Sequence, residues 1–214
     1  SVLRTIWGTK PRSDIHLRYL GEEYKPKNPM YALKKKIAYI SEDRSESGLF
    51  FGQPIKETVL MAHRNLQRKL FVKNKSEDKL LGQIIGEVQI KVPTHECMPE
   101  ALYGGNQQKL LFGRWITDEA KLLLLDEPTR GVDIKTKHEI YQRVRKMVEA
   151  NNAGALVVSS ELEELVLMCD KVLIIRDGHV EDVLTGDRIT ENNMMAEITA
   201  SGNTKQQTED NKSV

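Results

Sequence analysis

Two adjacent acids, Asp126 and Glu127, follow directly on a run of four leucines in this 214-residue sequence. A continuous apolar run is typical of a strand buried on both faces of a parallel sheet, and open α/β sheets place their ligands at the carboxyl ends of such strands. Asp126 could hold Mg²⁺, directly or through water, because this ion prefers carboxylate and phosphate oxygens. Glu127 could orient or deprotonate a water for phosphoryl transfer. The alternative for the letters DEPT is an ordinary surface turn.

A second candidate site is the pair Gly104-Gly105, which stands just before a predicted helix. Two glycines allow the backbone to approach an anion closely, and the free N–H groups at the start of a helix favour phosphate. The alternative is a plain turn that caps the helix. The glycine turn lies one helix upstream of the acidic strand, which places both features in one stretch of chain.

The elements that would position these residues alternate between helix and strand. Helices are predicted over 2–7 (ended by Gly8), 54–90, 102–116 after its opening turn, 134–150 and 161–169. Strands are predicted over 16–20, 36–41, 121–128 and 155–160. A hairpin around Asp177-Gly178 is predicted over 171–184. The strand at 155–160 is expected to be buried like the one at 121–128. This order predicts an α/β fold with a mostly parallel sheet flanked by helices. Residues 1–200 would form one incomplete domain containing a helical subdomain at 52–100, and 201–214 a disordered polar tail.

Composition excludes several classes of protein. The formal net charge is +1, so no global field recruits nucleic acid or anionic lipid. No apolar run reaches the ~20 residues of a membrane span, and the start of the chain has no signal-peptide core. Cys97 and Cys169 fit neither a disulfide framework nor a CxxC site, and His95 near Cys97 has no second ligand pair for zinc. A reducing cytosol is expected, and the missing initiator Met leaves processing or truncation of a longer chain open.

Four motifs carry a family resemblance. LYGGNQQK, LLLLDEPTRGVD and LVVSSELEEL resemble, in order and spacing, the signature, Walker B with D-loop, and switch regions of ABC ATPases. YISEDRSESGLF at 39–50 is similar to the modified Q-loop region in the second half of tandem ATPases that energise ribose, galactose and related sugar importers. The resemblance runs from about residue 2 to 198 and implies the P-loop-NTPase-like fold of ABC ATPases.

The resemblance also implies roles by position. Asp126 would be the Walker B magnesium ligand, Glu127 the catalytic carboxylate and Ser160 the residue at the switch position. The residues implied to bind nucleotide are Glu42 at the Q-loop position, Gly104, Gly105 and Gln107 facing the γ-phosphate of the opposite module, and Asp133 in the D-loop. Asp133 also suits the N-cap of the helix at 134, and both roles can hold together.

The sequence departs from the family pattern at three places. It contains no GxxxxGK[ST], and none of its 14 glycines is followed by Lys; VLRTIWG resembles the helix that follows this phosphate-binding loop. Tyr103 replaces the usual signature Ser, and Ser160 cannot act as an imidazole donor in place of the switch His. The isolated chain is therefore expected to be a poor ATPase.

The resemblance implies an ATP-binding subunit, or a fragment of one, that uses ATP and Mg²⁺ to drive uptake of a monosaccharide or related molecule. Its partners would be a membrane permease near residues 49–70, a second ABC module and, indirectly, a periplasmic binding protein, with no nucleic acid; its place would be the cytoplasmic face of the membrane. A catalytically inactive pseudo-ATPase that binds an intact ABC partner is the alternative. A soluble ABC protein of translation or DNA repair is a third possibility, against which the GGNQQK and EDR forms argue. A group of basic residues is interpreted as a solvated helix face, with a nucleic-acid patch as the alternative: Arg64, Arg68, Lys69, Lys73 and Lys75.

Overall fold

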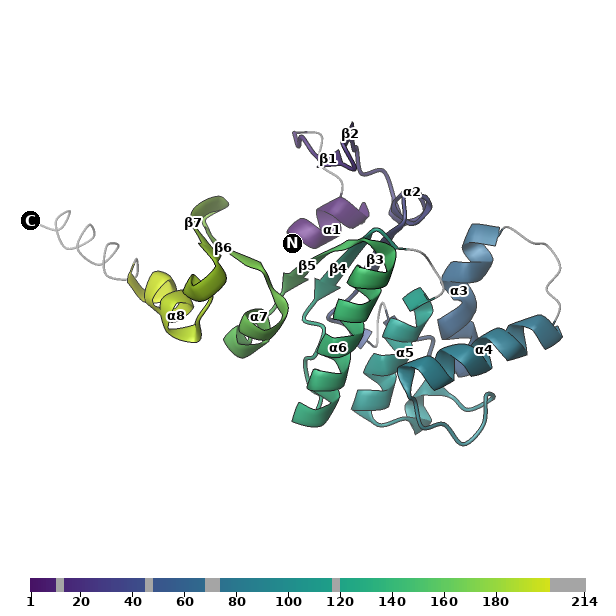
Figure 1. Ribbon diagram of the computed structural model, residues 1–214. Coiled ribbons are helices and arrows are strands. Elements are labelled where there is room, and N and C mark those ends of the chain that lie inside the picture. Colours follow the sequence, from purple (N-terminus) through teal and green to yellow (C-terminus); the bar gives the residue numbers. More distant parts are fainter. Residues whose placement is uncertain (11–13, 45–47, 68–73, 117–119, 201–214) are drawn as a thin grey trace, which may run out of the picture. The chain divides into compact units, whose positions relative to one another are not determined.

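The computed structural model describes residues 1–10, 14–44, 48–67, 74–116 and 120–200. The chain folds into two compact units, one spanning Ser1–Val158 and the other beginning at Ser159. The first unit contains a parallel sheet with its helices, and the second contains a β-hairpin with two helices (Figure 1). The tail predicted for 201–214 lies outside the described residues.

The parallel sheet has three strands, β3 (Ile37–Ile40), β4 (Leu122–Asp126) and β5 (Gly154–Val158), with β4 in the centre. The register pairs Ile40 with Leu125, and Asp126 with Val158. Because all three strands run parallel, their carboxyl ends meet at one edge of the sheet. The predicted α/β architecture is confirmed, and the acidic end of β4 lies at the edge where such sheets bind ligands.

The expectation that β5 is buried like β4 is wrong. Leu124 and Leu125 on β4 are completely buried, whereas Leu156 and Val158 on β5 are 40% and 44% exposed. Within the described residues β5 has a neighbouring strand on one side only. An apolar sequence indicates that a strand can be buried, but the strand is buried only where neighbouring elements cover it on both sides.

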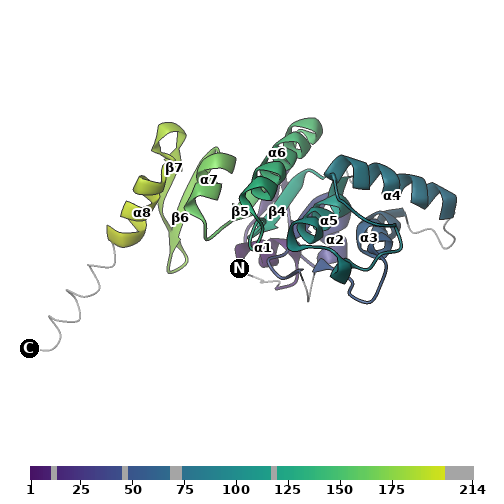
Figure 2. The ribbon, with the colours of Figure 1, turned by 90° about the horizontal axis from the view of Figure 1, so that it is seen from below.

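Helices lie on both faces of the sheet. On one face, α1 (Val2–Trp7) and α2 (Pro29–Lys34) pack Leu3 and Ala32 against Leu124. Figures 1 and 2 place α6 (Ile134–Asn151) on the opposite side of β4 from α1. Gly8 ends α1 as predicted, in the left-handed conformation at φ 88° that glycine adopts without a Cβ penalty.

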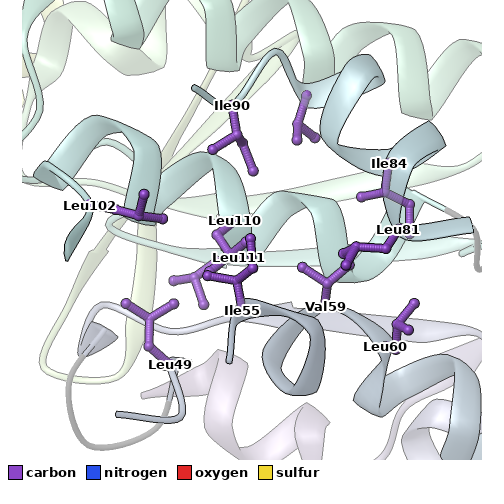
Figure 3. Packing of buried hydrophobic residues seen from close by; sticks show 11 residues of the cluster. Leu49, Ile55, Val59, Leu60, Leu81, Ile84, Ile90, Leu102, Leu110 and Leu111 are labelled. Carbon is purple, nitrogen blue, oxygen red and sulfur yellow. The ribbon is translucent and has the colours of Figure 1, made fainter. Parts of the chain in front are cut away.

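Three helices of the first unit share a core cluster. They are α3 (Ile55–Gln67), α4 (Asn74–Val88) and α5 (Gly104–Ile116), which follows the 3₁₀ turn Pro99–Ala101. Since α5 lies outside 52–100, the helical subdomain expected there remains a prediction. Side chains from all three helices interdigitate in Figure 3, and three that are fully buried are Val59, Ile84 and Leu110. Among the described helices, none is long and apolar enough to cross a membrane.

The second unit contains α7 (Leu162–Met168), the antiparallel pair β6 (Lys171–Arg176) and β7 (His179–Thr185), the 3₁₀ turn Gly186–Arg188, and α8 (Glu191–Ala200). The predicted hairpin is confirmed, since Asp177 and Gly178 both have positive φ, the requirement of a type I′ turn. The first unit also holds a short hairpin, β1 (Arg18–Tyr19) with β2 (Glu22–Glu23).

Candidate nucleotide site

Asp126 is the last residue of β4, and its side chain is held by neighbours from two other elements. The Tyr39 hydroxyl on β3 donates a hydrogen bond of 2.9 Å to Asp126 Oδ2. The Arg4 Nε on α1 lies 4.0 Å from the same oxygen. The residue is only 6% exposed, and a buried carboxylate requires such donors. The predicted magnesium ligand therefore has a fixed orientation at the carboxyl edge of the sheet.

Tyr39 remains a hydrogen-bond donor over the physiological range. Its pKa is raised, first because the ring is buried and second because the hydroxyl bonds to Asp126. The ring of Trp7 stacks on that of Tyr39, with centroids 5.7 Å apart. Tyr39 was not predicted as a site residue, because only the pairing of β3 with β4 brings it close to Asp126.

One carboxylate suits a magnesium ion that is shared with phosphate groups. Mg²⁺ keeps several waters and commonly takes one or two carboxylates together with substrate phosphates. No group of three or more His, Cys, Asp or Glu side chains gathers as a metal site in the described part of the chain. The single buried carboxylate of Asp126, at the ligand-binding edge of the sheet, fits a metal that is also bound by nucleotide phosphates.

Glu127 has a backbone conformation that non-glycine residues seldom adopt. Its φ is 50°, in the left-handed region that costs an L-residue about 1–2 kcal/mol. Its amide donates to the Val158 carbonyl at 2.8 Å, which extends the β4–β5 ladder, and its carbonyl accepts from Arg130 N at 3.3 Å to close a turn. Such strain is concentrated at functional sites, and here the turn directs the chain away from the sheet immediately after the magnesium ligand.

The glycine turn opens α5 as predicted. The helix starts at Gly104, and Gln107 N donates its first intrahelical bond to the Tyr103 carbonyl at 3.0 Å. The first amides of a helix have no intrahelical acceptor, so those of Gly104 and Gly105 suit an anion. The Gln107 side chain itself donates to the Pro99 carbonyl at 3.1 Å. Tyr103 is 88% exposed and leaves the turn open to solvent.

Asp133 caps α6. Its Oδ1 accepts from Thr136 N at 3.0 Å and its Oδ2 from the Thr136 hydroxyl at 2.7 Å. These bonds, first that from the hydroxyl, lower the pKa of the Asp133 carboxyl. The N-cap alternative for Asp133 is confirmed, and the D-loop role remains a prediction. A Cβ built on Gly105 would lie 3.0 Å from Thr136 Oγ1, so the start of α5 packs closely on the capped end of α6.

The segment after β3 joins this cluster. Glu42 is paired with the Arg130 guanidinium, and Arg44 Nη1 donates to the Gly104 carbonyl at 3.0 Å. Gln108 Nε2 on α5 donates to the Pro128 carbonyl at 2.5 Å. The structure thus brings Glu42 beside the loop after Glu127, a proximity that sequence reasoning did not predict.

Ser160 belongs to the second unit and is exposed. Beside it, the Ser159 hydroxyl accepts a hydrogen bond from Glu161 N at 3.0 Å, just ahead of α7. Its assignment to the switch position remains a prediction.

Among the basic residues predicted to form a solvated helix face, Arg64 is instead paired with two carboxylates. Arg64 donates to Glu77 through Nε at 2.6 Å and Nη2 at 2.7 Å, and to Glu57 through Nη1 at 2.5 Å. These pairs tie α3 to α4. Lys75 is exposed, and the remaining residues of that prediction, Arg68, Lys69 and Lys73, lie outside the described residues.

Comparison with protein families matches residues 1–130 to the family described as ABC transporter. Ribose import ATP-binding protein RbsA of Bacillus cereus is 34% identical over 196 residues, covering 91% of this chain and 39% of the relative. Galactose/methyl galactoside import ATP-binding protein MglA of Vibrio vulnificus is 30% identical over 197 residues, again covering 91% and 39%. The chain thus spans about two fifths of the length of these relatives.

Solved structures share the fold. A dimeric ATP-binding cassette in a post-hydrolysis state, bound to ADP and Pi, superimposes with a TM-score of 0.72 at 16% identity, covering 86% of this chain and 78% of the other. The ADP conformation of another ABC transporter cassette gives the same TM-score and identity over 91% and 78%. At this identity the likeness shows the fold alone, which is that of an ABC ATPase cassette.

Proposed function

The chain belongs to the ABC transporter family, and from this premise we propose that it is part of the ATP-binding subunit of an importer for a monosaccharide or related small molecule. Relatives named for ribose and galactose import align with about nine tenths of it. Because those relatives are much longer, we further propose that the chain is the carboxy-terminal part of the second of two ATPase modules. The EDR and GGNQQK forms support that position.

The phosphate-binding loop of the proposed module would be supplied from outside these 214 residues, since the sequence contains no GxxxxGK[ST]. The sheet supports this proposal: in the described residues β5 has one free edge, and Leu156 and Val158 are partly exposed. A further parallel strand carrying the loop could pair there. The alternative of an inactive partner gains no support from the relatives, which are named as import ATP-binding proteins.

The observation that carries the proposal is the fixed carboxylate of Asp126, followed at once by the strained Glu127. Bound Mg-ATP would supply the transferable phosphoryl group, with the metal neutralising charge on its oxygens. Asp126 would hold the metal, and the Tyr39 hydroxyl would keep that carboxylate oriented. Glu127 would take a proton from, or align, the attacking water. Ser160 would offer a neutral hydroxyl donor at the switch position.

The turn at Gly104 and Gly105 would serve a different nucleotide. Its free amides would donate to the γ-phosphate of ATP held by a second ABC module, with Gln107 beside them. Glu42, which is paired with Arg130, would contribute to nucleotide binding from the Q-loop position. Asp133 would communicate across the module pair while it caps α6.

The remaining partners follow from the same proposal. A membrane permease would contact the stretch 49–70, where Phe50 and Phe51 are 38% and 40% exposed, and large exposed apolar side chains mark interaction surfaces. A periplasmic binding protein would act through that permease. The subunit would lie on the cytoplasmic face of the membrane.

The test compares the 214-residue chain with the same chain preceded by the residues that its gene encodes ahead of Ser1. In calorimetry with Mg-ATP, the chain alone should bind more weakly than 1 μM, a limit of about −8 kcal/mol. The extended protein should bind and hydrolyse ATP, and Glu127→Gln should strongly lower the rate of hydrolysis but keep binding. Sub-micromolar binding by the chain alone would contradict the missing loop. An extended protein without nucleotide binding would overturn the proposed function.

A further inference from the structure

The Arg44 guanidinium lies between two glycines that belong to different segments. Its Nη1 donates to the Gly104 carbonyl at 3.0 Å. A Cβ built on Gly104 would lie 3.3 Å from Nη1, and one built on Gly131 would lie 3.0 Å from Nη2. The absence of side chains at these two positions makes room for the guanidinium. Arg44 therefore touches both the turn before α5 and the loop before α6.

That turn and that loop are already joined to each other without Arg44. Gln108 on α5 donates to the Pro128 carbonyl, and Gly105 packs against Thr136, which is bound to the Asp133 cap. Arg44 adds a third segment, the one that follows β3. Its neighbour Glu42 is paired with Arg130, next to Gly131, so this segment attaches to the cluster through two oppositely charged side chains.

The bond to Gly104 acts on an amide that the proposed reaction uses. The Gly104 carbonyl and the Gly105 N–H belong to one planar peptide unit, in which they point in opposite directions. A donor that fixes the carbonyl therefore also fixes the direction of the N–H. A charged donor on the carbonyl further polarises the peptide and strengthens its N–H as a donor. Glycine has wide backbone freedom, and this peptide lies in the first turn of α5, so the Arg44 bond reinforces the constraint that the helix places on it.

We propose that Arg44 is a positioning residue that holds the Gly104–Gly105 peptide so that its amide faces the anion, and that links this turn to the segment carrying Glu42. The first part rests on geometry alone; its role in catalysis rests on the proposed function. A movement of Glu42 would then change the position of Arg44, two residues further along the backbone. Through the guanidinium of Arg44 it would change the direction of the Gly105 N–H.

The first experiment uses the 214-residue chain and needs no nucleotide. Backbone ¹⁵N relaxation should give Gly105 an order parameter near the rigid value of about 0.85, and Arg44→Ala should lower it toward about 0.6. Arg44→Lys, which keeps a charged donor but loses the planar fork, should restore part of the difference. Arg176→Ala is the matched control, because it removes arginine-to-carbonyl bonds to Glu197 and Ile198 within the second unit. Near-ultraviolet circular dichroism checks that each variant is folded.

An unchanged Gly105 order parameter in both folded Arg44 variants overturns the inference, whatever the protein does with ATP. The second experiment measures hydrolysis in the extended protein. Arg44→Ala should lower kcat about tenfold with KM for Mg-ATP unchanged, because the turn acts on the other module's nucleotide, and Arg44→Lys should recover part of kcat. A rise in KM at constant kcat contradicts the catalytic role. An extended protein without ATPase activity in any form contradicts the proposed function, while the relaxation result still decides the role of Arg44.

Discussion

β4 and β5 are adjacent strands of one sheet with similar apolar sequences, yet only β4 is buried. Leu124 on β4 is completely buried, whereas Leu156, its partner across the β4–β5 ladder, is 40% exposed. β4 has a strand on each side and helices on both faces; β5 has one neighbouring strand in the described residues. The contrast shows that an apolar run gives a strand the capacity to be buried, while the surrounding elements decide whether it is.

The same contrast between covered and open positions recurs in the helices. Glu77 on α4 is 6% exposed, despite its charge, because Arg64 supplies two hydrogen bonds. Tyr103, at the start of α5, is 88% exposed despite its aromatic ring. Residue type alone predicts the opposite for both positions. Substitutions at covered positions should therefore change stability, and those at open positions should change function.

The largest effect is expected from Leu124→Ala. Truncating a fully buried leucine leaves a cavity and should lower the free energy of unfolding by about 2–5 kcal/mol. Leu156→Ala, the matched control on β5, should cost less than about 1 kcal/mol. Urea denaturation of the two variants measures the difference, and equal losses would show that β5 is as well covered as β4.

The carboxyl ends of the two strands should differ in function as well. In the extended protein, Glu127→Gln should lower turnover about a hundredfold, because it removes the base or the charge that aligns water. Ser160→Ala should lower it less than about tenfold, since only a neutral hydroxyl is lost. Steady-state hydrolysis with the other ATP site silenced gives both numbers. A larger loss of turnover in Ser160→Ala than in Glu127→Gln would mean that Ser160 matters more for catalysis than Glu127, contrary to their proposed roles.

The buried Glu77 should make the stability of the fold depend on pH. The hydrogen bonds from Arg64 lower the pKa of the Glu77 carboxyl below its ordinary 4.5. A lowered pKa stabilises the fold above the ordinary value, and this contribution is lost as the pH falls through the lowered pKa. Glu77→Gln should cost about 1–2 kcal/mol at pH 7, because Arg64 loses a charged partner but remains partly solvated.

Denaturant titrations between pH 7 and pH 3 follow this effect. The wild type should lose more stability below pH 4.5 than Glu77→Gln does. Asp78→Asn is the matched control, since that neighbouring carboxylate is 53% exposed and pairs with Lys56. If Asp78→Asn flattened the pH profile as much as Glu77→Gln, burial would not be the cause.

The smallest effect is expected at Tyr103. In the extended protein, Tyr103→Ser should raise single-turnover hydrolysis a few-fold, because the small hydroxyl replaces a ring where the partner's phosphate approaches. Tyr103→Phe keeps the ring and should leave the rate unchanged. Equal rates for all three forms would make Tyr103 a bystander whose ring stays aside in the solvent.

Sequence reasoning succeeded where the determining interactions are local. The end of α1 at Gly8, the cap of α6 by Asp133 and the turn at Asp177-Gly178 each depend on a few consecutive residues. The helix α2 was not predicted. Asn28 as N-cap and Pro29 at the first helical position were signals for it.

The contacts that complete the candidate site are not local. Tyr39 and Asp126 are 87 residues apart in the sequence, and Arg44 and Gly104 are 60 apart. No spacing rule connects such pairs; only the parallel register of β3 with β4 brings the first pair together. The exposure of β5 was also beyond prediction, because it depends on which strands flank it.

The order of β3 and β4 along the chain also bears on how the molecule folds. The two strands are hydrogen-bonded neighbours, but α3, α4 and α5 all lie between them in the sequence. Pairing distant strands early would close a long loop at an entropic cost, whereas the cluster of these helices is built from nearer contacts. We expect the helical cluster to form first and to shorten that loop, so that the sheet closes late. Pulse-labelled hydrogen exchange should then protect amides of α3 and α5 before those of β3, and simultaneous protection would contradict this order.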